Sequence, residues 1–178
     1  QGIEIRDLYS LKKIKNIKIK NFQTSFLDVL ADEIILGNET TQTISLKNWK
    51  TKTIENKEIK RSIKVLSYKR GNQIYFFTQD KYFKCKLLGF DKEKFTQLAT
   101  FSIDKQVQNF EIINQEIWLC TKEGVRVFSM NGKELSFTKN LPKDDISKVF
   151  KDKNNIFWFS SLKNGVYIIK NFQTLELQ

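Results

Sequence analysis

Four similar segments constrain the fold of this chain more than any other feature of its sequence. Each has a polar start, an apolar run with a large central residue, a polar turn and a second, alternating run. The central residues are Ile35, Tyr75, Trp118 and Trp158, and they follow one another at intervals of 40, 43 and 40 residues. A nearly constant period of this length indicates a repeat architecture.

Strand-like runs around each segment predict which repeat architecture this is. An apolar run precedes each segment, as in "SFLDVLA" and "SIKVLSY", and a fourth run follows some of them, as in "FTQLATF". Short strands at this spacing are typical of β-propeller blades, whereas helical repeats need stretches of period 3.6, which we do not find. We therefore expect an all-β chain of about four blades with three to four antiparallel strands each, as a closed ring or as part of a larger propeller.

The repeat divides the chain into four units within one propeller domain or fragment. The units are residues 25–61, 62–106, 107–145 and 146–178. Residues 11–22 precede them and alternate lysine with isoleucine, which predicts an extra strand that completes the last blade or belongs to a preceding one. The abrupt start and the strand-like end "LELQ" suggest a piece excised from a longer chain. Self-association of two chains is another way to complete a ring.

The last unit follows a known pattern: a hydrophobic strand, a D-x-x-G-x-[IL]-W turn and strand, a small polar residue, then G-[IL]-x-x-[YF]. Residues 144–174 fill it with Val149, Phe150, Asp152, Asn155, Trp158, Ser160, Gly165, Val166 and Tyr167. Residues 112–135 follow it with Trp118, Thr121, Gly124 and Val125. In these parts the chain resembles the two-component regulator propeller repeat family. It departs from the pattern where Asn155 replaces the usual turn glycine.

This resemblance implies a function and a location. Such propellers form the sensor region of bacterial hybrid two-component systems, where they meet a ligand, often a polysaccharide fragment, and signal through a membrane helix to a kinase. By resemblance, this chain is a periplasmic or extracellular, non-catalytic ligand sensor whose parent chain carries a kinase module. Two alternatives stay open: a free-standing propeller scaffold for protein–protein interaction, and nonspecific binding of polyanions or nucleic acid.

Loops at one end of the blades are where we expect a ligand, because functional residues concentrate in loops held by a rigid scaffold. Cationic side chains there suit the carboxylates of acidic sugars. The predicted ligand-binding residues are Lys69, Arg70, Lys122 and Lys163.

The repeated positions have a structural interpretation instead. We expect the central residues of the four segments to pack one blade on the next, and Gly124 and Gly165 to shape turns that need a positive φ. On this interpretation, replacing Trp158 with alanine costs about 3–5 kcal/mol of stability.

The residue inventory argues against an enzyme. The chain has no histidine, which excludes Ser-His-Asp and Cys-His catalytic groups. The adjacent carboxylates Asp32-Glu33 and Asp144-Asp145 fall where turns favour aspartate. Cys85 and Cys120 lack metal-binding spacing, and we expect buried free thiols. The sequence therefore predicts no catalysis, no cofactor and no metal.

Charge is the remaining functional signal. With 31 Lys and Arg against 20 Asp and Glu, the formal net charge is +11, which attracts polyanions at low salt. The densest cluster, residues 11–20, also fits a half-exposed strand whose lysines discourage aggregation, so a solvated lysine-rich surface is the simpler interpretation. The segment has no apolar run of about 18 residues, so we expect no membrane span in it.

Overall fold

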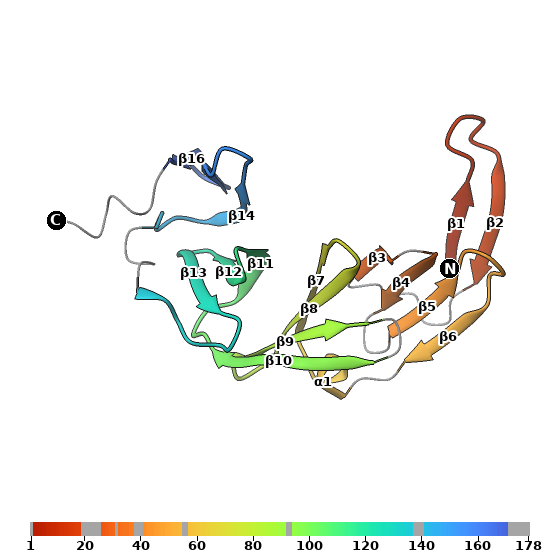
Figure 1. Ribbon diagram of the computed structural model, residues 1–178, viewed down its shortest axis with the longest axis horizontal. Helices are drawn as coiled ribbons and strands as arrows, with labels where there is room; N and C mark the ends of the chain where they lie inside the picture. Colours follow the sequence, from red (N-terminus) through yellow and green to blue (C-terminus); the bar gives the residue numbers. More distant parts are fainter. Residues whose placement is uncertain are drawn as a thin grey trace.

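The computed structural model of the chain describes residues 2–18, 26–30, 32–37, 41–54, 57–91, 94–136 and 141–170. In these residues the chain forms 16 strands and one short helix, α1 (Lys57–Lys60). The strands make five antiparallel sheets, which we name A to E in chain order (Figure 1).

The sheets follow the sequence without crossovers. Sheet A contains β1 (Gly2–Arg6) and β2 (Lys13–Lys18). Sheet B contains β3 (Phe26–Leu30), β4 (Glu33–Gly37), β5 (Thr41–Ser45) and β6 (Thr51–Ile54). Sheet C contains β7 (Lys64–Arg70), β8 (Gln73–Gln79), β9 (Lys84–Phe90) and β10 (Phe95–Ser102). Sheet D contains β11 (Val107–Ile113), β12 (Glu116–Thr121) and β13 (Gly124–Ser129), and sheet E contains β14 (Ile146–Lys151), β15 (Phe157–Ser161) and β16 (Gly165–Ile169).

The sheets are arranged like the blades of a propeller that does not close. The first strands contact each other from sheet to sheet, β3 with β7, β7 with β11 and β11 with β14. Figure 1 shows the sheets along an open arc, from the β1–β2 hairpin to β14–β16. Sheets B to E lie within the four units predicted from the repeat. The prediction of an all-β chain of small antiparallel sheets is confirmed, but the described residues form no closed ring.

Residues 11–22 contain an extra strand, β2. It pairs with β1 ahead of sheet B, and no described residue of it extends sheet E. The loop of this hairpin is held by Asp7, whose carboxylate accepts the backbone N–H groups of Tyr9 (3.1 Å) and Ser10 (2.7 Å). Pairing across a short loop costs less chain entropy than pairing with a distant strand. Residues 19–22 lie outside the described residues.

Apolar side chains between neighbouring sheets form the core. Sheets B and C enclose Ile35, Ile74, Phe76 and Phe90. Sheets C and D enclose Phe77, Leu87, Phe110 and Ile117. Sheets D and E enclose Trp118, Val127, Phe157 and Phe159. Because sheets C and D are covered on both faces, their strands carry nearly continuous apolar runs, such as "QIYFFTQ" in β8, instead of a strict alternation.

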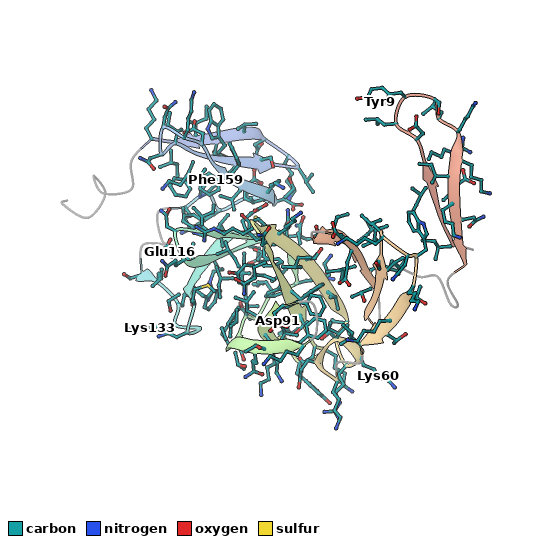
Figure 2. All side chains as sticks on the ribbon, turned by 45° about the vertical axis from the view of Figure 1, so that its right-hand side comes forward. Tyr9, Lys60, Asp91, Glu116, Lys133 and Phe159 are labelled. Atoms are coloured by element: carbon teal, nitrogen blue, oxygen red, sulfur yellow. The ribbon has the colours of Figure 1, made fainter. Side chains whose placement is uncertain are left out.

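The β1–β2 hairpin covers the remaining face of sheet B. Ile17 of β2 is 7% exposed and packs on Ile34, Leu36 and Ile44. The tip of this hairpin, marked by Tyr9 in Figure 2, points away from the body of the molecule.

The predicted thiols and glycines have clear structural positions. Cys85 and Cys120 are free and buried in different cores, which agrees with the prediction for them. Burial raises the pKa of each thiol to about 12, so both are unreactive near neutral pH. Gly124 (φ +118°) and Gly165 (φ +82°) both have positive φ. At Gly124 an added Cβ would also overlap the carbonyl oxygen of Pro142.

The two repeated tryptophans differ in environment although they are equivalent in register. Trp118 is 1% exposed and stacks on Phe157 of sheet E, with ring centroids 4.8 Å apart. Trp158 is 36% exposed, and its indole N–H donates to Asp152 at 3.1 Å. The packing role predicted for Trp158 is therefore not seen, because its face of sheet E meets no further sheet among the described residues.

This difference gives a matched test of the packing. We expect Trp118→Ala to lower the free energy of unfolding by about 3–5 kcal/mol, because it removes a fully buried ring between two sheets. We expect Trp158→Ala to cost roughly 1 kcal/mol, because much of that ring stays in water in both states. Urea unfolding of both variants measures the difference. Equal losses would contradict the assignment of the two environments.

Candidate functional site

The first strands of sheets C, D and E meet around a cavity of about 220 Å³. They converge because each is the strand that contacts its counterpart in the next sheet. The lining residues are Tyr68, Arg70, Glu111, Ile112, Ile113, Asn114, Val149, Phe150 and Lys151. The volume is below the roughly 300–1,000 Å³ of pockets that enclose drug-sized ligands, so a long ligand would place only part of itself here.

Sheet register explains which side chains line this cavity. Tyr68, Glu111 and Phe150 are the direct cross-strand partners of the repeated positions Tyr75, Trp118 and Trp158. They are therefore equivalent positions in three repeats. The repeat brings an aromatic, an acidic and a second aromatic residue to one place, although they are about 40 residues apart in the chain.

Glu111 is the buried charge of the site. It is 8% exposed, and its carboxylate accepts a bond from the ammonium group of Lys148 at 3.1 Å. Burial raises the pKa of Glu111 above its usual value, while hydrogen bonds from Lys148 and Tyr68 act in the opposite direction without cancelling the effect. The Tyr68 hydroxyl oxygen also lies 3.4 Å from the carbonyl oxygen of Ile112.

Two further cations stand at the cavity. Lys151 donates to the side-chain oxygen of Asn114 at 3.1 Å. Arg70 ends β7, is exposed, and forms no ion pair with any described carboxylate. With Glu111 offset by Lys148, the remaining charge at the cavity is positive. The site can therefore attract a carboxylate or another anionic group.

The four predicted ligand-binding residues do not lie together. Lys69 and Arg70 are at the end of β7, next to the turn between the first and second strands of sheet C. Lys122 and Lys163 are in turns between second and third strands, of sheets D and E. In an antiparallel sheet these two kinds of turn lie at opposite ends. Only Arg70 of the four lines the cavity.

Sequence reasoning missed the other polar residues of the site. They are Tyr68, Glu111, Asn114, Lys148 and Lys151. A signal existed for Tyr68 and Glu111 in the runs that precede each segment, because the residue opposite every repeated position is polar or aromatic: Asp28, Tyr68, Glu111 and Phe150.

The acidic pairs noted in the sequence serve local structure. Asp144 accepts hydrogen bonds from Asn164 (2.8 Å), Tyr167 (3.0 Å) and the Ser161 hydroxyl, and the last of these is the main cause that lowers the pKa of Asp144 to about 2. These bonds tie the segment before β14 to the β15–β16 turn. Asp32 forms an exposed ion pair with Lys47 at 2.9 Å.

In the described part of the chain, no three His, Cys, Asp or Glu side chains are grouped so that they could hold a metal ion. No helix there has the length and apolar character to cross a bilayer.

Comparison with known proteins supports the architecture. No family profile matches the chain, and no curated protein matches its sequence. Among solved structures, it resembles the computationally designed Ika4 protein, with TM-score 0.61, 10% identity and coverage of 85% of this chain and 94% of that one. It also resembles Hsv2 of Kluyveromyces lactis, with TM-score 0.64, 12% identity and coverage of 93% and 54%.

A third neighbour is virginiamycin B lyase from Staphylococcus aureus, with TM-score 0.58, 11% identity and coverage of 95% and 62%. Its catalytically inactive variant, in which a histidine is replaced by alanine, has TM-score 0.61 and 12% identity, and covers 96% and 63%. The chain thus spans little more than half of Hsv2 and of the lyase. Identities this low show a propeller-like fold alone.

The buried carboxyl group of Glu111 should make the stability of the chain depend on pH. Because the native pKa of Glu111 is raised, the folded chain binds this proton more tightly than the unfolded chain, and stability falls as pH rises between the unfolded and native pKa values. Glu111→Gln removes that titration. We expect the free energy of unfolding of the variant to rise relative to that of the native chain as the pH increases above the ordinary glutamate pKa of about 4.3. Urea unfolding at a series of pH values measures this difference. If the free energies of unfolding of the two proteins change in parallel with pH, Glu111 titrates normally and the prediction is wrong.

Proposed function

We propose that this chain is a non-catalytic, propeller-type recognition module that binds an acidic carbohydrate fragment at the cavity between β7, β11 and β14. The observation that carries the proposal is the cationic rim of this cavity. Arg70 is exposed without an ion-pair partner among the described residues, and Lys151 stands on the opposite side, in β14. A guanidinium group can hold a carboxylate with two parallel hydrogen bonds.

The ring of Tyr68 adds a second element of recognition. It lines the cavity and is partly exposed, and it packs against the Phe110 ring in a T-shaped arrangement with a centroid distance of 5.9 Å. Aromatic side chains combine an apolar face with a polar end, which suits a sugar ring with its hydroxyl groups. A fixed tyrosine beside an arginine therefore favours an acidic sugar over a simple inorganic anion.

The proposal that the module does no chemistry rests on its side chains. The lyase neighbour is catalytically inactive when a histidine is replaced, and this chain contains no histidine. The cavity has a single lining carboxylate, Glu111, which is engaged by Lys148. Paired acid–base chemistry would need a second group there.

The resemblance to two-component regulator propellers extends the proposal. On that basis the module is the periplasmic sensor part of a signalling protein whose kinase lies elsewhere in the parent chain. The alternative, a scaffold for protein partners, rests on the same architecture. Nonspecific polyanion binding through the basic surface is the third function, and it differs from the others in its steep dependence on salt.

Calorimetry with a short oligogalacturonate tests the proposal, with a neutral oligosaccharide of the same length as reference. We expect binding of the acidic sugar only, and a roughly 10- to 100-fold weaker affinity for Arg70→Ala, because a hydrogen bond to a charged group contributes about 1.5–3 kcal/mol. Lys122→Ala removes one positive charge at the other end of the sheets and should leave the affinity unchanged.

The same titrations can refute the proposal. Equal losses in Arg70→Ala and Lys122→Ala, together with a steep fall in affinity as salt rises, would assign the binding to the general positive charge. Binding of the neutral oligosaccharide with equal affinity would remove the role of the cations. If neither sugar binds, the carbohydrate proposal is wrong and the scaffold function becomes the favoured one.

A further inference from the structure

The outer face of sheet E has the same construction as the face of sheet D that sheet E covers. Phe150, Trp158 and Ile168 stand directly opposite one another across β14, β15 and β16. They are 58%, 36% and 50% exposed, and Val166 on the same face is 57% exposed. Four large apolar side chains therefore stand together on one exposed face of sheet E.

The corresponding row of sheet D is buried. It consists of Glu111, Trp118 and Val127, again directly opposite one another. Here Trp118 stacks on Phe157, and its ring also lies 6.3 Å from that of Phe159. Trp158 repeats the position of Trp118, but no described residue takes the place that Phe157 has beside Trp118.

We propose that the outer face of sheet E is a blade interface that receives one further sheet of the same repeat, carried on the same polypeptide. That sheet presents an aromatic ring at the position of Phe157, which stacks on Trp158. The observation that identifies this partner is the continuity with the interface between sheets D and E, which has the same register and the same tryptophan.

The other end of the arc argues against a head-to-tail second copy as the partner. The hairpin turns its apolar side, with Ile17, toward sheet B. On its strands the outward side carries Glu4, Arg6 and Asn16, with Ile14 as an apolar member, while the exposed Leu8, Tyr9 and Leu11 lie in the loop at its tip. The strand part of this face is largely polar and does not complement the apolar row on sheet E.

The size of the face argues against any second copy. Three strands about 4.8 Å apart, five residues long at about 3.4 Å per residue, present roughly 250 Å². Separate chains that associate stably bury about 800 Å² per partner. The net charge of +11 on each chain opposes self-association further. A covalently joined sheet avoids both limits, because linkage supplies a high effective concentration.

An extended chain tests the proposal. A second copy of residues 141–178 is added after Gln178, with Trp158→Phe in the added copy and Trp49→Phe in the original, so that only Trp118 and the original Trp158 fluoresce. We expect a blue-shifted emission and a roughly two-fold or larger drop in acrylamide quenching relative to the unextended Trp49→Phe chain, because the stacked ring is shielded from the quencher.

A matched control isolates the contact. In the extended chain, Phe157→Ser in the added copy alone should restore the quenching of the unextended chain. The proposal is wrong if acrylamide quenches Trp158 in the extended chain as strongly as in the unextended chain. It is also wrong if the extended chain with Phe157→Ser in the added copy shields Trp158 from acrylamide as well as the extended chain without that substitution.

The unextended chain provides an independent check that does not depend on folding of the added copy. Light scattering over a range of concentrations should show a monomer, and Trp158→Lys should fold with only the small loss of stability expected for Trp158→Ala. A dimer whose formation protects Trp158 would assign the face to a second copy. Loss of folding in Trp158→Lys would show that Trp158 serves this chain alone. Either result would overturn the proposal.

Discussion

Packing of one sheet face on the next is the interaction on which the rest of this structure depends. Every described backbone ladder lies within a single sheet, so no strand pairing holds one sheet to another. The position of each sheet is set by side chains such as Phe77 and Phe110, whose ring centroids are 5.7 Å apart between sheets C and D. Because interiors are close-packed, these contacts fix the angle between sheets and therefore the place where the first strands meet.

The cavity results from this packing, and the packing must also compensate the charge that is buried at the cavity. A residue that faces the next sheet at the inner edge is partly removed from water, and Glu111 has that position. A buried carboxylate is tolerated when a cation and hydrogen bonds compensate it. Lys148 comes from the neighbouring sheet, so the ion pair forms only if sheets D and E are correctly placed. The chemistry of the site and the stacking of the sheets are thus linked.

The sequence predicts the local structure well and the site poorly, for a physical reason. The strands around Tyr75 and Trp118 could be predicted because a hairpin is encoded by nearby residues and repeated. The cavity could not, because Tyr68, Glu111 and Lys151 become neighbours only through sheet packing, which single positions do not reveal. Lys122 and Lys163 were grouped with Arg70 because all are cations beside turns, but antiparallel pairing sends alternate turns to opposite ends. The register of Trp158 showed which way its face points, and could not show whether a sheet covers it.

Phe150 belongs both to the proposed ligand site and to the proposed blade interface. It lines the cavity and also belongs to the exposed row of sheet E. A sheet that docks on this row would contact Phe150 and bring its own first strand beside β14, which would add a further wall to the cavity. Ligand binding and sheet docking would then share a side chain, and each would change the free energy of the other by the same amount. The affinity measured on the unextended chain therefore describes a site that is open on the side of Phe150.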